Sequence, residues 1–188
     1  LELRGFRLPM VLTPPDTTET NAFNEFLKAA VWQGETNTLY GFGRNTLEPL
    51  DANTLPATLR HGGDTLPVGY FDGRNPLGDA QTRREHNFYG LYDLTGNVAE
   101  WVNDHGKYGA AGTRALCGGS YAEVPRPAGA ITLAPPNAAT DAGGFRPVTT
   151  YTEQDPVRIH ILLCFHRPGG ILDRDLARFG PGWTERHA

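Results

Sequence analysis

The sequence predicts a single, loop-rich α+β domain with little regular secondary structure. Three observations support this fold class. A chain of 188 residues is long enough for one compact domain with a hydrophobic core. Its 23 glycines and 15 prolines favour turns over long helices. One segment has apolar residues at helical spacing, whereas the other apolar segments are short and typical of strands.

Composition narrows the class of partner. The chain is 39% hydrophobic and 20% charged, which is typical of a folded domain. A net charge of -4 provides no basic surface for nucleic acid. The longest apolar run, Ile159 to Phe165, is far shorter than the roughly 20 residues that cross a bilayer. We therefore expect a protein or a small ligand as partner, with no nucleic acid and no membrane insertion.

The two cysteines, Cys117 and Cys164, each lie among apolar residues. Two such thiols are usually buried and reduced, so we expect no disulfide framework, which favours the cytoplasm. The sequence has no initiator Met and no signal-peptide pattern at Leu1. We therefore expect it to begin inside a longer protein, and no targeting signal can be deduced from it.

The first half of the chain is expected to hold one helix and many turns. Asp16 to Glu19 has the form of a capping box, apolar residues follow at helical spacing, and Gly34 supplies a stop. These features predict a helix over residues 17–32. Turn sequences then continue to about residue 86, with one brief strand predicted over 66–71.

In the second half, an apolar segment over 88–102 surrounds the turn Thr95-Gly96-Asn97. We expect it to contact a strand over 115–121 in the core. Four prolines between 125 and 144 predict a long surface loop there. The remaining predictions are β structure over 145–151 and 157–165 and a short helix over 171–179.

Two carboxylates flank the glycine turn. Asp93 and Glu100, together with inward-facing carbonyls near Gly96, would form the all-oxygen environment that Ca²⁺ prefers. Alternatively, both acids are solvated or salt-bridged at the surface. The spacing by itself does not decide between the two.

Residues 87–101 read NFYGLYDLTGNVAEW. They resemble the signature N-x-x-G-L-x-D-M-x-G-N-V-x-E-W of the formylglycine-generating-enzyme family, with Leu94 in place of the usual Met. Four further elements resemble the family in the same order: G-F-R-L-P at 5–9, E-F-L-K-A-A at 25–30, G-G-S-Y at 118–121 and G-F-R at 144–146. The resemblance implies the family's loop-rich fold, which is C-type-lectin-like. We expect residues 1–150 to form the C-terminal portion of that domain and 151–188 a C-terminal extension.

The resemblance also implies a metal. In the family, a structural Ca²⁺ is held by the positions that match Asp93 and Glu100 and by the carbonyls that match Gly96 and Val98. We therefore expect calcium at these four residues.

Family enzymes oxidise a sulfatase cysteine with a copper ion held by two cysteines. The matching positions here are Glu123 and Ala128, and neither can replace a thiolate for Cu(I). Cys117 precedes the glycines on the predicted strand, and we expect it to be a packed core thiol. We therefore expect no copper and assign no catalytic residue.

The same fold occurs in the variable proteins of diversity-generating retroelements, where the stretch between G-G-S and G-F-R displays ligand-binding residues. The matching stretch here is 121–143, which we call the contact loop. Its candidate ligand-binding residues are Tyr121, Glu123, Arg126, Ile131, Leu133, Asn137 and Asp141.

The leading hypothesis is therefore a non-catalytic module that binds a ligand or protein through the contact loop. The first alternative is a metal-dependent oxidoreductase, of the formylglycine-generating or sulfoxide-synthase type, completed by segments outside this sequence. A structural assembly component is a second alternative. A loop without specific function is a third.

Overall fold

The computed structural model describes residues 6–11, 24–60, 62–104 and 112–149. Two short helices, α1 (Glu25–Val31) and α2 (Leu55–Thr58), accompany eight short strands. The strands are β1 (Phe6–Arg7), β2 (Pro76–Leu77), β3 (Ala80–Gln81), β4 (Ala99–Trp101), β5 (Arg114–Cys117), β6 (Thr132–Ala134), β7 (Gly143–Phe145) and β8 (Val148–Thr149). The predicted α+β class with little regular structure is confirmed.

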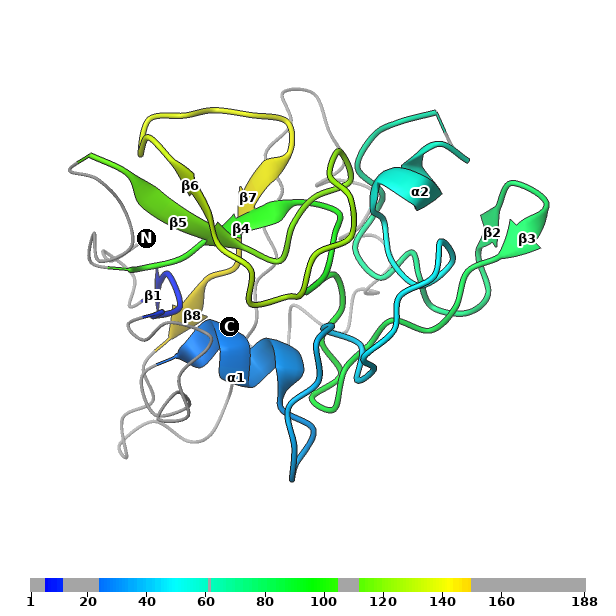
Figure 1. Cartoon of the computed structure of the whole chain (residues 1–188), viewed down its shortest axis with the longest axis horizontal. Coiled ribbons are helices and arrows are strands. Elements are labelled where there is room, and N and C mark those ends of the chain that lie inside the picture. Colours follow the sequence, from blue (N-terminus) through cyan, green and yellow to red (C-terminus); the bar gives the residue numbers. More distant parts are fainter. Residues whose placement is uncertain (1–5, 12–23, 61, 105–111, 150–188) are drawn as a thin grey trace, which may run out of the picture.

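A four-stranded sheet of order β6-β5-β4-β7 forms the centre of the fold (Figure 1). Strands β4 and β5 are antiparallel, with Glu100 opposite Cys117 and Trp101 opposite Leu116. Strands β4 and β7 are parallel, with Glu100 opposite Gly144. The predicted contact between 88–102 and 115–121 is therefore confirmed, and the same register brings the G-F-R element beside the signature.

The main hydrophobic cluster lies between α1 and the sheet. Phe26, Leu27, Ala30 and Val31 of α1 are buried in it together with residues of the strands and the signature. The helix begins at Glu25, because Asn24 caps it by accepting a hydrogen bond from the N–H of Leu27 at 2.9 Å. A continuous helix over 17–32 is thus wrong: the chain leaves helical geometry at Asn24, and the predicted capping box lies outside the described residues.

A second, smaller cluster lies beside the sheet, where Figure 1 shows α2 and the hairpin β2–β3 together. Ala57, Phe71 and Leu77 are its buried residues. The hairpin was not predicted, because its residues lie in the segment that was interpreted as turns up to about residue 86. The strand predicted over 66–71 is wrong: this segment is irregular, and side chains rather than a neighbouring strand satisfy its backbone.

The contact loop is more ordered than predicted. It contains β6 and the first residue of β7, both at edges of the central sheet, where the flanking prolines are tolerated. The β structure predicted over 145–151 is divided between the end of β7 and β8, which pairs with β1. The predictions for 157–165, 171–179 and Cys164 lie outside the described residues, and the division into 1–150 and 151–188 stays a prediction. Nowhere in the described ranges is there a helix long and apolar enough to span a membrane.

Candidate functional site

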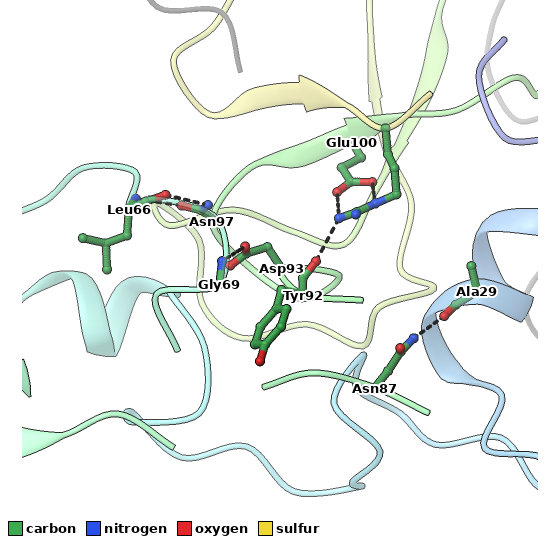
Figure 2. A network of polar contacts seen from close by, with 9 residues as sticks. Ala29, Leu66, Gly69, Asn87, Tyr92, Asp93, Asn97 and Glu100 are labelled. Atoms are coloured by element: carbon green, nitrogen blue, oxygen red, sulfur yellow. Dashed lines mark hydrogen bonds and ion pairs between the residues drawn. The ribbon is translucent and has the colours of Figure 1, made fainter. Parts of the chain in front are cut away.

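Asn87 opens the signature segment, residues 87–101, and joins it to α1. Its side-chain oxygen accepts hydrogen bonds from the N–H groups of Tyr89 and Leu91, at 2.9 and 3.0 Å. Its amide group donates to the carbonyl of Ala29 in α1 (Figure 2). An asparagine suits this position because its side-chain oxygen closes the turn while its side-chain nitrogen anchors α1.

Asn97 likewise joins the signature segment to another part of the chain, the segment that begins at Leu66. Its side chain accepts from the N–H of Leu66 at 2.9 Å and donates to the Leu66 carbonyl at 3.0 Å (Figure 2). This two-point contact replaces a strand partner. Asn97 itself has a φ of 62°, a conformation that asparagine tolerates better than most residues.

Two glycines of the resemblance are required by close approach. Gly96 has a φ of 77°, and a Cβ there would lie 2.4 Å from the carbonyl oxygen of Asn53. A Cβ on Gly144 would lie 2.7 Å from a methyl group of Val98. A larger residue at Gly96 would collide with the backbone of Asn53, and one at Gly144 with the side chain of Val98.

Glu100 and Arg146 form a buried ion pair that joins β4 to the residue after β7. The guanidinium donates two hydrogen bonds to the carboxylate, at 3.0 and 2.6 Å, and a third to the carbonyl of Tyr92 at 3.0 Å. Both side chains are about one-twentieth exposed. Burial raises the pKa of Glu100, and the charge and hydrogen bonds of Arg146 oppose that rise.

Two further acids are buried beside this pair. Asp93, at a φ of 57°, accepts a hydrogen bond from the N–H of Gly69 at 2.8 Å (Figure 2). Burial raises its pKa to about 6, against the effects of the Gly69 hydrogen bond and Arg146. Burial, and then the charge of Asp93, raises the pKa of Glu85 well above its usual range. We refer to Glu85, Asp93, Glu100 and Arg146 as the buried charge cluster.

The structure brings together the four residues predicted to bind calcium, since Asp93, Gly96, Val98 and Glu100 are all buried in one turn and strand. Their surroundings fit calcium only in part. Both oxygens of Glu100 already accept hydrogen bonds from the Arg146 guanidinium. In the described part of the chain, no three His, Cys, Asp or Glu side chains are grouped as a metal site.

The candidate binding residues of the contact loop fall into two groups. Tyr121, Glu123, Arg126 and Ile131 are half-buried, and Arg126 donates to the Thr132 hydroxyl at 2.7 Å and to the Ile131 carbonyl at 3.3 Å. Leu133, Asn137 and Asp141 are exposed, Leu133 by 43%. Arg126 therefore braces the loop, and the three exposed residues are accessible to a partner. Val124, at 64%, is an exposed apolar residue of the loop that sequence reasoning missed.

Residues 21–151 match the family model of the sulfatase-modifying factor enzyme 1-like domain. The match spans well over half of the chain. The chain belongs to this family.

Among solved structures, the crystal structure of CarF is 26% identical with a TM-score of 0.51, and the match covers 78% of this chain and 48% of CarF. Treponema denticola variable protein 1 is also 26% identical, with a TM-score of 0.49, over 76% of this chain and 46% of that protein. The chain thus spans about half the length of both structures. No curated protein sequence matches it. The predicted formylglycine-generating-enzyme-like fold is confirmed.

At the two positions that match the copper-binding cysteines of this family, the chain has Glu123 and Ala128. The Glu123 carboxylate lies 3.9 Å from the Arg126 guanidinium, and Ala128 is fully buried in the main hydrophobic cluster. Cys117 is also buried, on β5, where burial and then the charges of Glu100 and Asp104 raise its pKa to about 12. Burial therefore keeps the Cys117 thiol protonated at neutral pH in the metal-free chain.

Sequence reasoning missed two members of the buried charge cluster. Arg146 was visible within the G-F-R element, but nothing in the sequence showed its partner. Glu85 carries no recognisable signal, because it belongs to the segment of turn sequences that was predicted up to about residue 86.

Proposed function

We propose that this domain is a non-catalytic binding module that uses its sulfatase-modifying-factor scaffold to present the contact loop to a protein or small ligand. The observation that carries the proposal is the chemistry at Glu123 and Ala128. An ion-paired carboxylate and a packed methyl group occupy the positions of the copper-binding thiols. The nearest cysteine in the sequence, Cys117, is buried and protonated at neutral pH.

The contact loop has the features of a recognition surface. Arg126 fixes its base through the Thr132 hydroxyl and the Ile131 carbonyl, and β6 holds its middle against β5. Leu133 and Val124 then expose apolar area, and Asn137 and Asp141 add polar groups. A braced loop with exposed apolar and polar groups loses little entropy on binding, which favours affinity.

Affinity capture with paired variants tests the contact face. The triple variant Leu133→Ser, Asn137→Ala, Asp141→Ala changes only exposed side chains, so it is expected to fold like the wild type. Leu59→Ser is the matched control, because Leu59 is 78% exposed and lies at the end of α2, outside the contact loop. We expect a partner identified by mass spectrometry to bind the wild type and the control and to bind the triple variant at least about tenfold more weakly. Equal binding by all three proteins would reject the contact loop.

A further inference from the structure

β6 is an edge strand of the central sheet (Figure 1). In the described part of the chain its one strand neighbour is β5, and the register places Ala115 of β5 directly opposite Leu133 of β6. An edge strand whose outer N–H and C=O groups lack partners can pair with a strand from another chain. What such a strand would meet depends on which groups of β6 point outward.

The backbone of Ala115 faces β4 rather than β6. Its carbonyl accepts a hydrogen bond from the N–H of Val102 at 3.1 Å, and its N–H donates to the carboxylate of Asp104 at 3.1 Å. In an antiparallel pair of strands, hydrogen-bonded and non-hydrogen-bonded residue pairs alternate. Ala115 and Leu133 therefore form a non-hydrogen-bonded pair, so the N–H and C=O of Leu133 point away from β5, toward the open edge of the sheet.

The neighbouring outward positions limit the length of the contact. Along an extended chain, alternate residues direct their backbone groups to the same side, so these positions are Ile131 and Pro135. The carbonyl of Ile131 already accepts a hydrogen bond from Arg126 at 3.3 Å, and a proline has no N–H to donate. Leu133 is therefore the residue of β6 that offers both a donor and an acceptor, and one residue of an antiparallel strand would satisfy both.

The Leu133 side chain adds apolar surface at the same place. Directly opposed residues of two strands lie on the same face of a sheet. Ala115 is fully buried in the main hydrophobic cluster, and Ile131 packs against that cluster. Leu133 continues this face beyond Ile131, but it is 43% exposed. A strand added at the edge could place an apolar side chain beside Leu133 and so extend the core.

We propose that the outer edge of β6 binds an extended, apolar segment of a protein partner as an added strand, through two hydrogen bonds to the main chain of Leu133. The inference rests on the proposed function, because Leu133 belongs to the contact loop, and it names the chemistry of the partner. Main-chain hydrogen bonds supply affinity that does not depend on sequence, and the side chain beside Leu133 supplies selectivity.

Amide hydrogen exchange measured by NMR tests the geometry of the free chain. The N–H of Leu133 should exchange at least about 100-fold faster than those of Thr132 and Ala134, which face β5. Equal protection of all three amides would overturn the proposal. It would mean that a second copy of the chain, or another segment of the same chain, already covers the edge.

Short linear peptides provide the probe for binding. They are selected on the wild-type chain from a random display library, and those that the triple variant of the contact loop binds more weakly are retained. We expect the retained peptides to bind Leu133→Ala more weakly than the wild type, and Leu133→Pro at least about tenfold more weakly than Leu133→Ala. Leu133→Ala is the matched control, because it shortens the side chain but keeps the outward N–H. Proline removes that N–H, a change that an edge strand tolerates.

Two measurements on the wild-type chain complete the test. Methylation of one backbone nitrogen of the peptide, at the residue opposite Leu133, should weaken binding at least about tenfold. The Leu133 amide should also become protected from exchange in the complex. If Leu133→Pro does not fold, these two measurements decide, because neither needs a variant.

The results separate strand addition from the contact loop as a whole. Retained peptides that bind Leu133→Pro and Leu133→Ala equally would overturn strand addition and leave the contact loop as the binding surface. A Leu133 amide that still exchanges rapidly in the complex would do the same. If no peptide is retained, strand addition is overturned, whereas the capture experiment still decides whether the contact loop binds a partner.

Discussion

Replacing Arg146 by Met would isolate the buried carboxylate of Glu100. The side chains of this pair are 5% and 6% exposed, and the guanidinium makes two hydrogen bonds to the carboxylate. Methionine retains much of the volume and removes the charge and every donor. Removing one partner of a buried pair typically costs roughly 3–5 kcal/mol, a large share of the 5–15 kcal/mol that a domain has in total.

Arg7→Met is a matched control, because Arg7 and Glu25 also form a two-point ion pair, with side chains 27% and 35% exposed. Solvent screening should limit its cost to about 1 kcal/mol. Urea unfolding measures the stability of both variants. Glu100→Gln and the double variant Glu100→Gln, Arg146→Met complete a thermodynamic cycle. If Arg146→Met cost no more than Arg7→Met, the buried pair would not be what holds β7 to β4. If Arg146→Met fails to fold, Arg146→Lys provides a milder change to measure.

Three further predictions concern the signature, the thiol and the acids. Gly96→Ala should destabilise the domain clearly more than Gly90→Ala. Both glycines have a positive φ, which costs an alanine about 1–2 kcal/mol, but only the Cβ at position 96 would meet backbone, at 2.4 Å. Equal losses of stability in urea unfolding would contradict this prediction. In a Cys164→Ser variant at pH 8, iodoacetamide should alkylate Cys117 at least about 100-fold more slowly in the native protein than in the protein unfolded by guanidinium. The reason is that burial raises the pKa of the Cys117 thiol to about 12. Rapid labelling of the native protein would contradict the burial of Cys117. In EDTA, the free energy of unfolding should fall as the pH rises from about 4 through 6. Over this range the folded state keeps a proton on Asp93 that the unfolded state has already lost, and this difference lowers stability by up to about 3 kcal/mol. Asp93→Asn should remove that part of the slope, and an unchanged slope would show that Asp93 titrates normally.

The sequence allowed the fold to be predicted where local chemistry is specific. Gly96 and Asn97 indicated a turn because few residues tolerate their backbone conformations, and the pairing of 88–102 with 115–121 followed from two apolar segments. The segment from Leu66 was mistaken for a strand because its backbone partner is the side chain of Asn97, 31 residues away. Local sequence cannot reveal such a partner.

The candidate site was predictable to a lesser extent, for a related reason. Asp93 and Glu100 were predicted to be calcium ligands, but the cation beside Glu100 is Arg146, which only the parallel pairing of β4 and β7 brings near. Exposure within the contact loop also depends on tertiary structure. Composition did not separate bracing residues such as Arg126 from exposed ones such as Leu133.

Oxygen consumption by the copper-treated protein, in the presence of a thiol reductant and a cysteine-containing sulfatase-type peptide, tests most directly whether the domain has lost catalysis. Copper content is measured on the same sample after free metal is removed. With Glu123 and Ala128 at the matching positions and Cys117 buried, we predict less than stoichiometric copper and no peptide-dependent oxygen uptake above a copper-only blank. Stoichiometric copper with thiol- and peptide-dependent oxygen uptake would contradict the assignment as a binding module.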